Sequence, residues 1–391
     1  MSTSTASAPT GTRIRARTDA RLPSLTGLRW IAALMVWGFH LRTVDPTSND
    51  TVSAVFQPFT HGALGVSFFF VLSGFVLVWS ARPGDTAGRF LRRRFAKIYP
   101  NHAVALVFAV VLVALTTGGL SAKTILSNAL LINSWLLRPG WPNAINAVSW
   151  TLCCEAFFYV SLPFLLPRLR RLTTERLYIG LALVPLGALL VGTVIRTLVP
   201  HPHVDNIGFF PPMRYHEFLV GVIVGELMVR NRWAGPRLWP SLGLVVIAYV
   251  AHFFQDMSVV IPLAFASLIA SAASADLSGA WSPWRWRPLV LLGEASYAFY
   301  LVHHLVMVTA VRVGEWLDPG RRFWFGAQPV LGGAGLYVVG TLAVAIVLAF
   351  AMYYGVERPM MKGLRPKPRR PALGAELDSE KALPQAVVVG P

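Results

Sequence analysis

The sequence predicts an all-α polytopic membrane protein with about ten transmembrane helices and both termini in the cytoplasm. Three observations lead to this fold class: the composition, a series of long apolar segments, and the placement of basic residues between them. Of the 391 residues, 54% are hydrophobic and only 14% are charged, with a mean hydropathy of +0.54. Average proteins have about 25% charged residues, so a chain this poor in charge is typical of proteins that sit in lipid.

Apolar segments of spanning length follow one another along most of the chain. A bilayer core of about 30 Å needs about 20 mostly apolar residues per helix. Ten segments meet this requirement: 25–43, 62–80, 100–117, 147–166, 178–198, 213–229, 238–254, 257–276, 290–313 and 332–354. A shorter apolar piece at 124–137 precedes Pro139 and Pro142, and we interpret it as an interfacial or re-entrant element.

The basic residues indicate the orientation. With a cytoplasmic N-terminus, 26 of the 35 lysines and arginines fall in the two ends and in the cytoplasmic connections. This excess is the usual signature of cytoplasmic loops, so the net charge of +17 reflects topology. We therefore expect the lipid bilayer, and no nucleic acid, as a partner. Residues 1–21 and 362–391 are polar or low in complexity and are expected to be disordered around one membrane domain, 22–361.

The first apolar segment holds two ionisable side chains, Arg29 and His40. Each costs roughly 2.5–3.5 kcal/mol to insert at the centre of a helix, so two together need a reason. Eleven helical residues bring His40 back to within about 20° of the face of Arg29, about 16 Å further along. The pair therefore predicts a polar stripe that faces other helices. The alternative is that Arg29 extends to the membrane surface and His40 ends the helix.

Further polar side chains lie in later spans. They are Glu155 in the fourth, Arg214 and Glu217 in the sixth, and Tyr297, Tyr300 and His303 in the ninth. We expect those in the sixth and ninth spans to bind substrate. Counting rise from the expected membrane surfaces places His40, Glu155 and His303 at a similar height. Histidine near a carboxylate is a general-base arrangement, and either Glu155 or Asp45 is available as the partner of His40. The histidine spacing predicts no metal site, and Arg214 and Glu217, three residues apart, could simply pair.

The cytoplasmic connection after the second span has five cations in the nine positions 89–97. Among them Arg92, Arg93, Arg94 and Lys97 could bind the phosphates of a nucleotide-bearing cofactor or the headgroups of anionic lipids.

Two pairs of small residues have structural interpretations. Ser73 and Gly74 interrupt an aromatic run and predict close helix packing or a kink. Cys153 and Cys154 are adjacent in an apolar segment and are expected to be small core residues, because neighbouring cysteines make a poor disulfide.

Taken in order, these segments resemble the acyltransferase-3 family of membrane acyltransferases. The resemblance covers roughly residues 22–360 and rests on LTGLRWIAALMVWGFH, GVSFFFVLSGFVL, the basic run ending KIYP, SWTLCCEAFFY, RYHEFLVGVIVGE, LGEASYAFYLVHH and VERPM. It implies ten spans and transfer of an acyl group from acyl-CoA to a hydroxyl. It also implies His40 as the catalytic histidine with Arg29 beside it in function, and Arg94 and Lys97 as the paired basic residues that meet the donor. Lysine stands at 97 where arginine is usual, and it cannot make a bidentate phosphate pair.

Within that family, the compact length and the opening RLPSLTGLRW look like the actinobacterial enzymes that esterify macrolide or ansamycin hydroxyls. The resemblance thus implies a multi-pass enzyme of the bacterial plasma membrane, with acetyl-, propionyl- or another short-chain acyl-CoA as co-substrate. We expect His40 to act as general base, and Glu155 to orient or support an imidazole. O-acylation of cell-envelope polysaccharide or glycolipid is the alternative acceptor class, and a transporter is the alternative of another kind. The sequence leaves open the oligomeric state, the acyl length, the face by which the acceptor enters, and whether the acyl group passes through His40.

Overall fold

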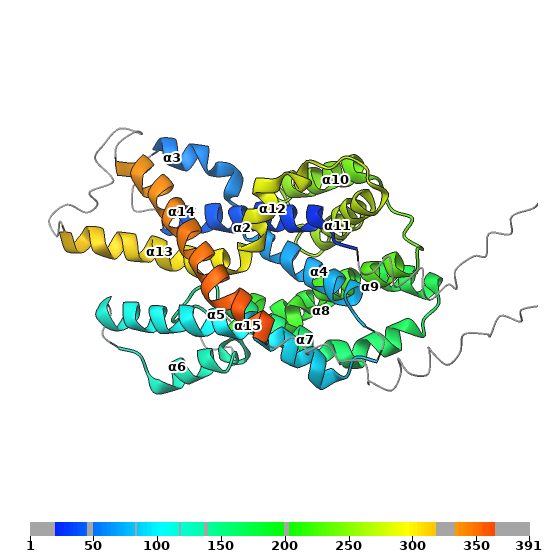
Figure 1. Ribbon diagram of the computed structural model, residues 1–391, viewed down its shortest axis with the longest axis horizontal. Helices are drawn as coiled ribbons and strands as arrows, with labels where there is room; N and C mark the ends of the chain where they lie inside the picture. The colour runs from blue at the N-terminus through cyan, green and yellow to red at the C-terminus, as the bar shows by residue number, and fades with distance from the viewer. Residues whose placement is uncertain are drawn as a thin grey trace, which may run out of the picture.

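The computed structural model describes residues 20–44, 50–82, 84–116, 119–136, 140–198, 203–317 and 333–363, and its elements are all helical (Figure 1). The first half contains α2 (Pro23–Val44), α3 (Asp50–Val55), η1 (Gln57–Phe59), α4 (Leu64–Trp79), α5 (Ala87–Thr116), α6 (Ala122–Ala129), η2 (Asn133–Trp135), α7 (Trp150–Arg170) and α8 (Thr174–Leu198). The second half contains η3 (His203–Phe209), η4 (Pro211–Arg214), α9 (Tyr215–Val229), α10 (Leu238–Ala251), α11 (Ile261–Ser278), η5 (Pro283–Arg285), α12 (Arg287–Glu294), α13 (Ser296–Leu317), α14 (Gly333–Met352), the π-helix η6 (Tyr353–Glu357) and α15 (Arg358–Gly363).

A helix lies over each of the ten segments that the sequence predicts to span. Within the described residues, six helices are long and apolar enough to cross a membrane: Ala87–Thr116, Trp150–Arg170, Thr174–Leu198, Ile261–Ser278, Ser296–Leu317 and Ala334–Gly363. Two further apolar helices, α4 and α10, are shorter. The chain is therefore a helical membrane protein, while the count of ten spans and the position of the termini stay predictions. The predicted disordered ends lie almost entirely outside the described residues.

Helix α2 is the central element of the bundle. It contacts α4, α11, α12 and α13, and Figure 1 shows it between α13 and α14 on one side and α10 and α11 on the other. Its apolar residues form two stripes at helical spacing. Leu25, Leu28 and Ala32 pack with α4 and α11, whereas Trp30, Ala33, Trp37 and Leu41 pack with α13 and α14. A helix that is apolar on more than one face is buried, so Arg29 and His40 are held among protein side chains.

The start of α2 is fixed by a polar clamp. The Ser24 amide and hydroxyl donate to the two carboxylate oxygens of Asp276 at the end of α11, at 2.8 and 2.6 Å. The carboxylate thus satisfies one of the amides that a helix start leaves unpaired. One turn on, a methyl group at Gly27 would lie 2.0 Å from the Trp284 carbonyl oxygen, so only glycine permits this approach. The height of Arg29 and His40 is set by these contacts.

Helices α4 and α9 cross at their glycines. A methyl at Gly74 would lie 2.3 Å from the Phe218 carbonyl oxygen, and one at Gly221 would lie 1.9 Å from that of Val71. Small residues let helix backbones approach closely in membranes, where packing supplies much of the association energy. The predicted close packing at Gly74 is confirmed.

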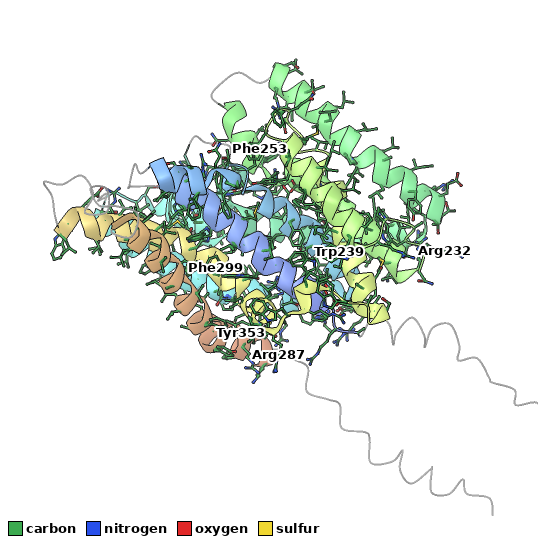
Figure 2. All side chains as sticks on the ribbon, turned by 90° about the horizontal axis from the view of Figure 1, so that it is seen from above. Arg232, Trp239, Phe253, Arg287, Phe299 and Tyr353 are labelled. Carbon is green, nitrogen blue, oxygen red and sulfur yellow. The ribbon has the colours of Figure 1, made fainter. Side chains whose placement is uncertain are left out.

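The basic connections lie at one end of the bundle, which we call the basic end. It comprises the start of α2, the ends of α4, α7, α9 and α11, and the segments that follow these four helices. Figure 2 shows Arg232, Trp239 and Arg287 toward this end and Phe253 toward the other, where α10 finishes. The predicted interfacial piece 124–137 falls on α6, which buries Thr124, Ser127 and Asn128 and exposes Leu126. The position of this segment at the membrane surface stays a prediction.

Candidate active site

His40 and His303 form a hydrogen-bonded pair inside the bundle. The distance between Nδ1 of His40 on α2 and Nε2 of His303 on α13 is 3.0 Å. His303 is completely buried, and its ring stacks on Phe299 at a centroid distance of 5.6 Å. The sequence placed both histidines in the site but assigned His303 to substrate binding. The structure instead makes it the partner of His40.

Two backbone carbonyls determine which ring nitrogens of the pair carry protons. Nδ1 of His40 lies 3.1 Å from the Val36 carbonyl oxygen, and Nδ1 of His303 lies 3.2 Å from that of Phe299. Because a carbonyl oxygen only accepts, we assign the proton of each neutral imidazole to Nδ1, and Nδ1–H of His40 is then shared between the Val36 carbonyl oxygen and Nε2 of His303. Nε2 of His303 is then unprotonated and accepts from Nδ1–H of His40. This leaves Nε2 of His40 with a free lone pair, which is the form required of a general base.

A third imidazole lies beside this pair. The ring of His304 is edge-on to that of His40, at a centroid distance of 5.1 Å. Its Nδ1 is buried and has no hydrogen-bond partner among the described residues. Sequence reasoning noted His304 next to His303 but gave it no role, because a single position cannot tell which of two adjacent histidines faces inward.

Glu155 does not belong to this histidine group. Its carboxylate accepts from the Tyr159 hydroxyl at 3.2 Å, and its electrostatic neighbours are Lys97, Arg29 and Arg94. The sequence led us to expect Glu155 beside an imidazole, whereas the structure places it beside Lys97 and Arg29. A count of helical rise gives depth along one helix, but it does not say which neighbours a side chain of α7 meets. The other carboxylate considered, Asp45, lies outside the described residues.

Instead, five ionisable side chains from four helical segments form a second group, which we call the charge cluster. They are Arg29 of α2, Arg94 and Lys97 of α5, Glu155 of α7 and Glu357 of η6. The side chains of Arg29 and Lys97 make no ion pair or hydrogen bond to another described residue. Glu357, by contrast, is held by the Asn101 amide at 2.9 Å. Three cations against two carboxylates leave the cluster with a positive excess, which suits it to an anionic ligand.

The basic run divides into residues that face inward and residues that do not. Arg94 and Lys97 lie in the charge cluster, while Arg92 is exposed. Arg93 forms a bidentate ion pair with Asp85, and its Nη1 is 3.0 Å from Oδ1. The hydrogen bond from Arg93 holds the pKa of the Asp85 carboxyl below its ordinary value. Four cations were expected to meet a donor phosphate. Two of them, Arg94 and Lys97, face inward, Arg92 faces outward, and Arg93 is paired with Asp85.

One face of α13 connects the two groups. Tyr297 lies at the charge cluster, where its hydroxyl donates to the Ile98 carbonyl oxygen at 2.9 Å. Tyr300, one turn on, donates to the Val148 carbonyl oxygen at 3.4 Å, and its ring centroid is 5.7 Å from that of His303. Positions three apart share a helix face, so this stripe leads from the cations to the histidine pair.

Arg214 and Glu217 form the predicted pair, with Nη2 and Oε1 3.1 Å apart. The Ser67 hydroxyl also donates to the Glu217 carboxylate at 2.8 Å, and Glu217 is fully buried. The Arg214 guanidinium lies over the rings of Phe70 and Trp150 at 5.7 and 5.8 Å. The pair therefore lies in the interior of the bundle rather than at its surface. The charge of Arg214 acts on the hydroxyl of Tyr300.

Sequence reasoning missed three members of this interior. Tyr159 lies four residues after Glu155, a spacing that could have identified it. Asn101 directly follows the basic run, and Glu357 lies in VERPM, beyond the expected end of the last span. Glu357 reaches the interior through the π-helical turn η6, a feature that is frequent at functional sites but invisible in a hydropathy pattern.

Comparisons with known proteins agree with this architecture. The model of the family described as an acyltransferase domain, Acyl_transf_3, matches residues 22–350. The chain is 35% identical to acyltransferase MdmB of Streptomyces mycarofaciens, over 88% of this chain and 92% of that protein. It is 28% identical to the exopolysaccharide production protein ExoZ of Rhizobium meliloti, over 81% of this chain and 94% of the relative.

A more distant relative is longer. The chain is 23% identical to peptidoglycan O-acetyltransferase OatA of Listeria monocytogenes, over 83% of this chain but 55% of that protein. No solved structure matches the chain. The family match covers most of the membrane region and includes both the histidine pair and, except for Glu357, the charge cluster. The chain belongs to the Acyl_transf_3 family of acyltransferases.

Proposed function

We propose that this protein is a membrane O-acyltransferase that moves an acyl group from acyl-CoA to a hydroxyl of a macrolide- or ansamycin-type small molecule. The observation that carries the proposal is the chain of two hydrogen bonds from the Phe299 carbonyl through His303 to His40. With the protons assigned as above, it leaves Nε2 of His40 unprotonated and able to act as a base. Family membership supplies the reaction class, and the similarity to MdmB, which spans nearly the whole of both chains, favours a compact enzyme of the same kind.

The reaction needs one proton acceptor and one leaving group. Nε2 of His40 removes the proton of the acceptor hydroxyl while its oxygen forms a bond to the thioester carbon. The carbon–sulfur bond then breaks, the coenzyme A thiolate leaves, and His40 returns the proton to that sulfur. His303 holds the ring of His40 in one tautomer throughout, as a positioning residue.

The donor is assigned to the charge cluster. The side chains of Arg29 and Lys97 have N–H groups that donate to no described residue. Arg94 adds a guanidinium on the side of the basic end. Phosphate oxygens are suited to such donors. Arg29 and His40 are about 16 Å apart along α2, so a long extended arm has to join the phosphates to the reacting carbon. The pantetheine arm of coenzyme A is a long, extended chain of this kind.

The acceptor is assigned to the far side of the Arg214–Glu217 pair. A cavity of about 490 Å³ lies there between α8, η3, η4 and residues 256–260, lined by apolar side chains together with polar ones that include Arg196, Arg214, His216 and Asp256. Its size and mixed lining are typical of small-molecule sites. Nε2 of His216 is buried without a described partner and is available to an acceptor oxygen.

The decisive experiment is mass spectrometry of purified protein incubated with short-chain acyl-CoAs and two sets of acceptors. One set contains macrolide and ansamycin alcohols, and the other contains cell-envelope saccharides. We expect an ester product on the first set that His40→Ala abolishes while the variant still folds and inserts. Undiminished turnover by His40→Ala would refute the assignment of the base.

Products on saccharides alone would favour the second candidate, O-acylation of an envelope polysaccharide. The names of ExoZ and OatA favour that candidate, since one is an exopolysaccharide production protein and the other acts on peptidoglycan. The mechanism at His40 would be the same for both acceptor classes.

A further inference from the structure

A groove at the basic end lies outside both the histidine pair and the charge cluster. It has a volume of about 300 Å³ and lies between residues 81–90 and the last turns of α7. One side is formed by Phe90 of α5, and the other by Leu162, Pro163 and Pro167 of α7. These flat and rigid apolar surfaces suit an aromatic ring.

Two arginines stand at the rim of this groove. The Arg82 side chain is exposed and forms neither an ion pair nor a hydrogen bond with the described residues. Arg170 is 3.5 Å from the Glu226 carboxylate, which Arg230 already binds at 2.9 Å. The acidic residue of the groove, Asp85, is neutralised by Arg93. The rim is therefore positive and retains donors for an anion.

Arg94 links the groove to the charge cluster. Its guanidinium lies over the Phe90 ring at 5.4 Å, and its Nη2 reaches the Ser80 hydroxyl at 3.4 Å. On its other side, Tyr159 and Glu155 are its electrostatic neighbours. A ligand with an aromatic ring in the groove and phosphates at Arg94 would continue toward Lys97 and Arg29.

We propose that this groove binds the 3′-phosphorylated adenosine end of coenzyme A, with the adenine between Phe90 and the α7 prolines and the 3′-phosphate at Arg82 and Arg170. The inference rests on the proposed use of acyl-CoA and deepens it by assigning the nucleotide end. Arg94 then receives the diphosphate, and the arm runs past the charge cluster to His40. The same chemistry, a phosphate beside apolar surfaces, also occurs in a lipid headgroup, so the test separates the two sources.

The test measures binding of coenzyme A and of 3′-dephospho-coenzyme A to the full chain in phosphatidylcholine nanodiscs. Neither ligand needs an acceptor or turnover. The wild type is expected to bind coenzyme A at least tenfold more tightly, because a charge-assisted hydrogen bond to the 3′-phosphate is lost in the second ligand. Arg82→Gln and Arg170→Gln each bring the ratio of affinities toward one by weakening only coenzyme A.

Arg176→Gln is the matched control. Arg176 is an exposed arginine at the start of α8 that does not line the groove, so its removal changes the charge of the same end by the same amount. The ratio should stay at its wild-type value in this variant. A ratio that falls equally in all three variants would show only a general electrostatic effect and would overturn the proposal.

Two further results would also overturn it. The first is equal affinity of the wild type for both ligands, which leaves the proposed acyltransferase intact but removes the nucleotide from this groove. With that result, phosphatidylglycerol that is retained by the wild type and lost in Arg82→Gln would assign the arginines to a lipid headgroup. The second is absence of coenzyme A binding altogether, which would refute the proposed donor itself.

Discussion

At the scale of single residues, the centre of this protein is an imidazole whose proton positions are dictated by two carbonyls. The sequence identified His40 and His303 because ionisable groups are rare in apolar helices. It could not pair them, since they are 263 residues apart and only packing of α2 against α13 brings them together. For the same reason Glu155 was placed with His40, although it interacts with Lys97.

The role of His303 can be separated from a merely structural one. His303→Leu should lower kcat by about 10–100-fold, as loss of a partner that orients a functional imidazole commonly does, with little change in the KM for acyl-CoA. His303→Gln should recover much of the loss, because its amide oxygen can accept from Nδ1–H of His40. Steady-state kinetics of the two variants test this. Equal impairment of both, with a raised KM, would indicate a folding defect instead.

The Asp85–Arg93 pair at the basic end should make the stability of the fold depend on pH. Because Arg93 lowers the pKa of Asp85 in the folded state, the pair stabilises the fold fully above the ordinary carboxyl value of about 4 and loses this effect as pH falls through the lowered pKa. The contribution of such a partly exposed pair is about 1 kcal/mol or less.

The melting temperatures of the wild type and of Asp85→Asn should therefore differ by a constant amount near neutral pH and converge in acid. A difference that widens on acidification would contradict the assigned direction.

At the scale of elements, the hydropathy pattern located a helix over every predicted segment, because the length of a span and its composition are local properties. It could not predict how the helices cross. Gly74 was recognised as a packing position, but its partner Gly221 was not, since small residues identify a contact surface without identifying the neighbour. The π-helical turn that brings Glu357 inward was missed for a similar reason.

The crossing of α4 and α9 predicts a sharp difference between two glycines. Gly221→Ala should lower the free energy of unfolding by about 1–3 kcal/mol, because the new methyl group would overlap the Val71 carbonyl. Gly243→Ala on α10 meets nothing within 4 Å and should leave stability unchanged or slightly raised. Thermal unfolding in detergent measures both. Similar effects at the two positions would argue against the close crossing.

At the scale of the whole molecule, the basic end should face the cytoplasm. Gln255 and Ala280 are exposed and lie before and after α11, whose 18 residues extend about 27 Å. In intact cells, an impermeant maleimide should label Gln255→Cys and spare Ala280→Cys until the membrane is opened.

The native thiols of Cys153 and Cys154 are fully buried, as predicted, and should not react. The reverse labelling pattern would invert the orientation and place the groove that we propose for the nucleotide outside the cell.

Among the described residues no carboxylate bonds to His40 or His303, and this determines how the pair responds to a membrane potential. A hydrogen-bonded pair of neutral imidazoles carries no net charge at rest, so the transmembrane voltage exerts no force on it. The charge cluster, with its excess cation, does feel the field, at about 2.3 kcal/mol per charge for a full crossing of 100 mV. If the charge cluster holds an anionic donor as we propose, voltage changes how tightly that donor binds and leaves the histidine pair unaffected, so the pair is the same in a living cell and in an isolated vesicle.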